Sequence, residues 1–87
     1  MILHTIKKIT DLEGNDRLDG RYPLRIGRRG RLLLNGRGCS MVIEYYPREN
    51  EDYAGYLHTS TVEGLEAENY ITKVTTRNSI YYFEEER

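Results

Sequence analysis

The chain has 87 residues, a formal net charge of −1 at pH 7 and 38% hydrophobic side chains. This length favours one small β domain over residues 1–87. The single cysteine, Cys39, excludes an intramolecular disulfide framework and a cysteine-rich zinc site, so a reducing, cytoplasmic location is expected. No apolar run approaches the roughly 20 residues of a membrane-spanning helix, and no membrane partner is therefore expected.

The composition favours strands over helices. Only two residues are alanine, whereas seven are threonine, seven are isoleucine and eight are tyrosine. β-Branched and aromatic side chains are enriched in strands, and the eight glycines leave few stretches long enough for a helix.

Residues 2–9 (ILHTIKKI) are predicted to form the first strand. The following segment, residues 10–20, is rich in turn-forming Gly, Asn and Asp. Within this segment Leu12 and Leu18 are expected to fold back onto the core.

Residues 21–26 (RYPLRI) alternate apolar and polar side chains, which predicts a second strand. Because Pro23 has no amide donor, this strand should lie at an edge or begin at the proline. Residues 27–30 suit a hairpin connection to a return strand over residues 31–34, and Asn35-Gly36 is a strong turn signal.

Residues 39–46 (CSMVIEYY) are predicted to form the next strand, with Met41 and Ile43 on the same face. A polar loop should follow at residues 47–52, and residues 53–62 again read as extended.

The acidic segment 63–69 is compatible with a short helical turn or with a wide loop. After it, residues 69–76 and 79–86 form two strand-like runs that flank Arg77-Asn78. Two such runs separated by two residues predict a tight hairpin.

Together these segments predict five to seven short antiparallel strands with a turn about every ten residues. Such spacing is typical of an all-β barrel or sandwich. At this length a small, strongly bent barrel of the SH3-like or OB-like type fits best, since closing the sheet protects its edges.

The C-terminal part of the chain resembles small proteins of Gram-positive bacteria and their mobile elements. The resemblance lies in the pattern T-S-x-V followed by T-x-N-S-x-Y, here at Thr59–Val62 and Thr76–Tyr81. It implies a bacterial protein ending in a β-hairpin, and it implies no activity.

No residue pattern predicts catalysis, a metal site or a cofactor. His4, His58 and Cys39 lack the spacing of zinc ligands, and Ser60 beside His58 is not part of a nucleophile motif. The glycine-rich segments lack the lysine and the following helix of a phosphate-binding loop. The acidic segment 63–69 lacks the spacing of an EF-hand.

The charges are distributed unevenly along the chain. Residues 1–40 carry nine cations and four anions, whereas residues 41–87 carry four cations and ten anions. The two halves therefore have balances of +5 and −6, and the arginines are concentrated between positions 17 and 37. Arginine and tyrosine are enriched at binding surfaces. The predicted binding residues are accordingly Arg21, Arg25, Arg28, Arg29, Arg31, Arg37, Tyr22, Tyr45 and Tyr46.

Two functions compete for this surface. The first is a non-enzymatic module that binds a protein partner or a second copy of itself. The alternative is nucleic-acid binding, in which the arginines contact phosphates and the tyrosines stack on bases. The sequence pI of about 6.1 argues against a dedicated nucleic-acid binder, whose domain pI usually exceeds about 9.

Overall fold

A computed structural model describes residues 2–33, 37–47 and 55–86 of the chain. In this part of the protein, six strands and one short helix follow one another. They are β1 (His4–Thr10), α1 (Tyr22–Arg25), β2 (Arg29–Leu33), β3 (Ser40–Tyr45), β4 (Gly55–Glu68), β5 (Ile71–Thr76) and β6 (Ile80–Glu85).

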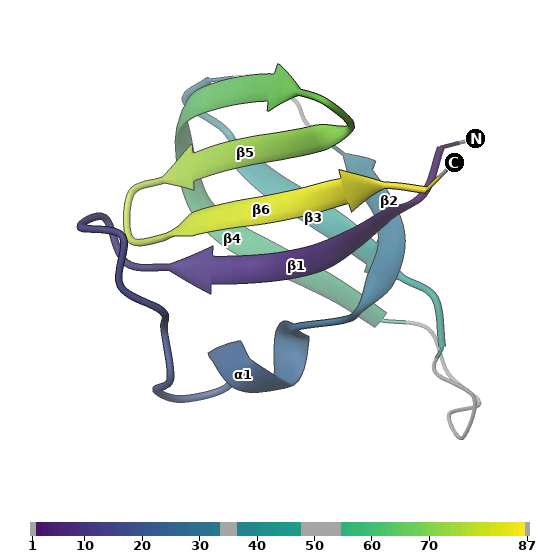
Figure 1. The fold of residues 1–87 in the computed structure, drawn as a ribbon, viewed down its shortest axis with the longest axis horizontal. Helices are drawn as coiled ribbons and strands as arrows, with labels where there is room; N and C mark the ends of the chain where they lie inside the picture. Colours follow the sequence, from purple (N-terminus) through teal and green to yellow (C-terminus); the bar gives the residue numbers. More distant parts are fainter. Residues whose placement is uncertain (1, 34–36, 48–54, 87) are drawn as a thin grey trace.

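The strands form one closed antiparallel barrel in the order β1-β2-β3-β4-β5-β6 (Figure 1). This confirms the prediction of a small all-β barrel of five to seven antiparallel strands. The barrel closes because β1 pairs with both the second and the last strand. Six residue pairs join β1 to β6, whereas only His4↔Gly30 and Thr5↔Arg29 join β1 to β2. The two first strands therefore separate soon after they meet.

The fourth strand is much longer than the sequence predicted. Residues up to Thr61 pair with β3, and residues from Val62 onward pair with β5. Register shifts at Ser40/Val42 and Val62/Gly64 bend the sheet where β4 changes partners. The prediction of a helical turn or loop at residues 63–69 was wrong, because this segment continues β4 as far as Glu68.

The prediction of a strand at residues 21–26 was also wrong. Tyr22–Arg25 form a single helical turn with Pro23 near its start, a position where the missing amide hydrogen costs nothing. The alternation of Tyr22, Leu24 and Ile26 suggested a strand, but Leu24 and Ile26 are exposed. Leu12 and Leu18 also remain exposed and do not fold back onto the core.

The two C-terminal hairpins use different turns. Glu68 pairs with Ile71, and the intervening Asn69 and Tyr70 have φ of 50° and 68°. Positive φ at both positions is typical of a type I′ turn, whose twist matches that of the strands. The predicted hairpin at Arg77-Asn78 is confirmed between β5 and β6. The Asn35-Gly36 turn and most of the predicted loop at 47–52 lie outside the described residues.

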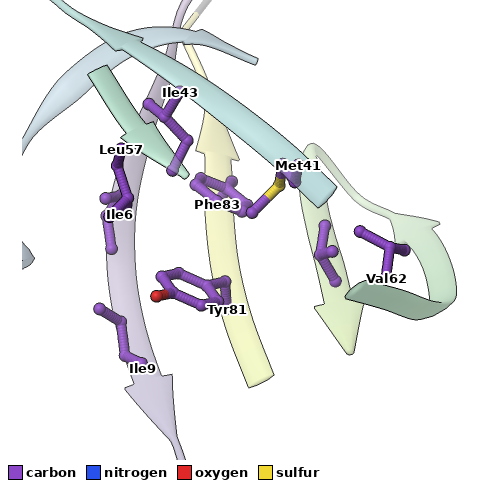
Figure 2. Packing of buried hydrophobic residues seen from close by; sticks show 9 residues of the cluster. Ile6, Ile9, Met41, Ile43, Leu57, Val62, Tyr81 and Phe83 are labelled. Carbon is purple, nitrogen blue, oxygen red and sulfur yellow. The ribbon is translucent and has the colours of Figure 1, made fainter. Parts of the chain in front are cut away.

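The buried side chains of the barrel interior come from β1, β3, β4, β5 and β6 (Figure 2). From β2, the half-buried Leu32 packs against them. Met41 and Ile43 share the inward face of β3, as predicted, and are almost completely buried. The Tyr81 and Phe83 rings of β6 stack with centroids 6.0 Å apart. The full set of buried core residues is Ile6, Ile9, Met41, Ile43, Leu57, Val62, Val74, Tyr81 and Phe83.

Gly30 lies where the backbone of β2 closely approaches that of β3. It pairs with His4 on one side and with Tyr45 on the other. A Cβ atom at this position would lie 2.2 Å from the backbone oxygen of Glu44. Because backbone atoms cannot move aside as a flexible side chain can, only glycine fits here.

Substitution Gly30→Ala is therefore expected to destabilise the protein by about 3 kcal/mol, through overpacking against β3. Gly55→Ala is the matched control, because a Cβ atom at Gly55 meets nothing within 4 Å. Urea unfolding of the two variants tests the difference. Equal midpoints for the two variants would contradict the role of Gly30 in closing the barrel.

His4 is a half-buried titratable group in the barrel wall. Its ring meets Phe83 edge-on at 6.4 Å, and its Nδ1 is buried without a hydrogen-bond partner among the described residues. Burial lowers the pKa of His4 below its ordinary value of 6.5, and the carboxylate of Glu85 only partly opposes this. Protonation is therefore less favourable in the folded chain than in the unfolded chain.

The sign of the pH dependence follows from this shift. The unfolded chain binds a proton at His4 more readily than the folded chain does. The free energy of unfolding therefore carries no penalty from His4 above pH 6.5, and it decreases as pH falls from 6.5 towards the pKa of His4 in the folded chain. Thermal unfolding between about pH 7.5 and 5.5 should show this decline. His4→Asn should flatten the profile. An unaltered profile in His4→Asn would contradict the assignment.

Candidate binding surface

The predicted binding residues fall into three places in the structure. Arg21, Tyr22 and Arg25 lie at α1. Arg28, Arg29, Arg31, Tyr45 and Tyr46 lie at or beside β2 and β3. Arg37 lies before β3, next to the bend of β4.

At α1, the Tyr22 ring contacts two guanidinium groups. The Arg17 and Arg25 guanidinium carbons lie 4.2 and 4.7 Å from the ring centroid. The Tyr22 hydroxyl is also 3.3 Å from Ser79 Oγ. Each guanidinium–ring contact contributes about 0.5–2 kcal/mol. This stack fastens α1 to the side of the barrel where β1 and β2 separate.

Both arginines of the stack also bind the start of β6. Arg17 Nη1 donates to the carbonyl of Asn78 at 2.9 Å and to Ser79 Oγ at 3.0 Å. Arg25 Nη1 donates to the Tyr81 hydroxyl at 3.0 Å. Burial raises the pKa of Tyr81 above its usual value, and the neighbouring Arg25 partly opposes this. The phenol therefore stays neutral and accepts the hydrogen bond.

Arg17 also binds the carboxylate of Asp19, with Nη2 3.1 Å from Oδ2. This hydrogen bond lowers the pKa of Asp19. Arg17 lay within the arginine-rich segment but was not among the nine predicted binding residues. Its role in packing was not visible in the sequence, because its partners Asn78 and Ser79, just before β6, lie more than 60 positions away along the chain.

The arginines of the β2 region contact protein groups as well. Arg28 is 8% exposed, and its guanidinium lies 4.5 Å from the Tyr45 ring centroid. Arg29 makes a forked ion pair with Glu86, at 2.9 and 3.1 Å from Nη2. It also lies 6.0 Å from the Tyr46 ring.

The last two predicted arginines are exposed on different parts of the surface. Arg31 is the ladder partner of Glu44 across β2 and β3. Arg37 Nε donates to the backbone oxygen of Glu63 at 3.2 Å. The structure thus brings Arg25 to Tyr22 and Arg28 to Tyr45, and it uses most of the predicted residues in contacts within the chain.

A surface that the sequence did not predict lies around α1. Leu18 is 80% exposed, Leu24 67% and Ile26 40%. A shallow groove of about 230 Å³ is lined by Leu18 and Ile26 of this group, and also by Lys7, Lys8, Arg17 and Asp16. This surface, the α1 face, comprises Lys7, Lys8, Leu18, Pro23, Leu24 and Ile26.

The position of the two lysines follows from an irregularity in β1. Ile6 pairs with Phe83 and Lys8 with Tyr82, so Lys7 is an extra residue opposite β6. Both lysines are exposed, and the Lys8 ammonium lies 5.6 Å from the Tyr82 ring centroid. The groove consequently has a positively charged rim.

Other chemistry-bearing side chains do not gather into a site within the described residues. Cys39 is exposed as a free thiol. In residues 2–33, 37–47 and 55–86, no group of three or more His, Cys, Asp and Glu residues is placed to hold a metal ion. No helix in these ranges is long and apolar enough to cross a membrane.

The chain matches no protein-family model, no curated protein and no solved structure. The resemblance to small Gram-positive proteins therefore stays a prediction, and a functional assignment has to be argued from the surface itself.

Replacement of Tyr22 tests whether the stack fastens α1. Tyr22→Leu removes both guanidinium–ring contacts and the hydroxyl, and should lower the free energy of unfolding by about 2 kcal/mol. Tyr56→Leu, at a ring that is 63% exposed, is the control and should have little effect. Chemical unfolding measures both, and equal stability in the two variants would contradict the role of the stack.

Proposed function

We propose that the protein is a non-enzymatic interaction module, and that its α1 face binds an acidic segment of a partner protein carrying apolar anchor residues. The observation that carries this proposal is the exposure of Leu18, Leu24 and Ile26 on one short stretch of chain. Contiguous exposed apolar side chains rimmed by polar residues mark interaction sites on small soluble domains.

The charge of the groove supports an acidic partner. Lys7, Lys8 and Arg17 line it together with a single carboxylate, that of Asp16. A carboxylate-rich segment gains from this positive rim, while its apolar side chains cover the leucines.

The attachment of α1 also supports binding. Arg17 and Arg25 both contact the Tyr22 ring and donate hydrogen bonds to Asn78 and Tyr81, just before and within β6. A surface fastened in this way loses little conformational freedom when a partner docks, which favours affinity.

Nucleic-acid binding takes second place. Arg25, Arg28, Arg29 and Arg37 contact a phenol, an aromatic ring, a carboxylate and a backbone carbonyl of the same chain. A phosphate backbone would have to compete with these contacts. We further propose a cytoplasmic location, since the exposed thiol of Cys39 is stable in a reducing compartment.

A defined peptide panel tests the proposal. The probes are fluorescein-labelled peptides in which two or three leucines alternate with aspartate and glutamate, with lysine-substituted peptides as controls. Fluorescence anisotropy should show binding of the acidic peptides that weakens as salt rises. Leu24→Ser should reduce the affinity about tenfold.

Leu65→Ser is the matched control variant, because Leu65 is an exposed leucine outside the α1 face. It should leave acidic-peptide binding unchanged. The proposal is wrong if no acidic peptide binds, or if Leu24→Ser binds as well as the original chain. Tight, salt-sensitive binding of labelled single-stranded DNA in the absence of peptide binding would favour the alternative instead.

A further inference from the structure

We infer that the outer edge of β4, over Leu65–Glu68, receives a basic extended segment of a partner protein as an added strand. This surface is separate from the α1 face and lies at the other end of the molecule in Figure 1. The ladder between β3 and β4 ends at Thr61, whereas β5 accompanies β4 as far as Glu68. The last part of β4 therefore has a strand on one side only among the described residues.

The hairpin register decides which backbone groups point outward. In a two-residue hairpin the residues that flank the turn exchange hydrogen bonds, and the bonded pairs then alternate along the ladder. Glu68↔Ile71 and Glu66↔Lys73 are consequently the bonded pairs. The N–H and C=O groups of Leu65 and Ala67 point away from β5.

No other described segment occupies these groups. Gly38 and Cys39 bond to Val62, and Arg37 Nε donates to the carbonyl of Glu63. Within the described ranges no backbone hydrogen bond reaches Leu65 or Ala67 from the outer side. All residues from Leu65 to Glu68 are exposed, so a strand can approach this edge directly.

The negative charge of this edge favours a basic strand as the binding partner. Glu66 and Glu68 lie on the same face of this edge, and a groove of about 470 Å³ beside them is also lined by Lys73 and Tyr82. Two copies of the edge paired with each other would bring these glutamates together, and like charges opposite each other destabilise a sheet. A strand that carries lysine or arginine is attracted by these glutamates, whereas a second copy of the edge is repelled by them.

The side-chain alternation of β4 defines the pattern of the partner. Residues beside Glu66 and Glu68 should be basic, and residues beside Leu65 and Ala67 should be apolar or β-branched. Main-chain hydrogen bonds would supply affinity and this alternation would supply specificity, as in other cases of strand addition.

The probe for this edge is a labelled peptide Gly-Ser-Lys-Val-Lys-Val-Lys-Ser-Gly, with a glutamate-for-lysine peptide as its control. Anisotropy should show binding of the lysine peptide alone. Hydrogen exchange should show that the amides of Leu65 and Ala67 exchange rapidly in the free protein and are protected by the peptide, while that of Glu66 is protected throughout.

Ala67→Pro removes an outward N–H that the ladder to β5 does not use, and should reduce the affinity about tenfold. Ala67→Val keeps this N–H and should bind as the original chain does. Thermal unfolding verifies that both variants are folded. Glu66→Lys combined with Glu68→Lys leaves the backbone edge in place and should reverse the preference to the glutamate peptide.

Three results would overturn the inference. The first is that the lysine peptide does not bind at about 50 mM salt, where surface charges are weakly screened. The second is that Ala67→Pro and Ala67→Val bind the peptide equally well. The third is that the original chain self-associates and Ala67→Pro abolishes this self-association. Leu24→Ser should leave lysine-peptide binding intact. Failure at this edge and failure at the α1 face are therefore seen separately.

Discussion

The close approach of β2 to β3 at Gly30 is the constraint on which the barrel depends. With no Cβ atom, Gly30 can sit against the backbone of Glu44 and still pair with His4. The sheet closes at this point, but β1 and β2 share only two residue pairs before they separate. The chain between them must therefore cover the side of the barrel left open. The segment around α1 does this, fastened by the contacts of the Tyr22 ring with Arg17 and Arg25.

This use of arginine explains why the uneven charge of the sequence does not become one basic surface. Closure of the barrel pairs β1 with β6, so the basic start of the chain meets its acidic end. Arg29 binds Glu86, and Arg37 binds the backbone of Glu63. Other guanidinium groups lie over tyrosine rings. The positive charge left around the groove comes mainly from Lys7 and Lys8, which the irregularity in β1 presents to solvent.

The two proposed surfaces arise from the same mismatch between neighbouring strands. β1 continues beyond its two residue pairs with β2. There α1 and the turn-rich segment before it lie between the two strands and leave leucines exposed to solvent. β4 also continues beyond its pairing with β3, and this leaves an edge that carries glutamates and that no described strand covers. An apolar surface with a basic rim and an acidic strand edge favour different partners. We propose that a module with both surfaces holds two different segments.

The sequence alone determined the fold class, most strands and the Arg77-Asn78 hairpin, because alternation and turn chemistry act over a few residues. It also indicated the inward face of β3 at Met41 and Ile43. Only the tertiary structure decided that residues 21–26 form a helical turn and that residues 63–68 extend β4. The conformation of each of these segments depends on which other parts of the folded chain it contacts. The same reason governs the surface, since the contacts of Arg17 and the exposure of Leu24 depend on residues far away along the chain.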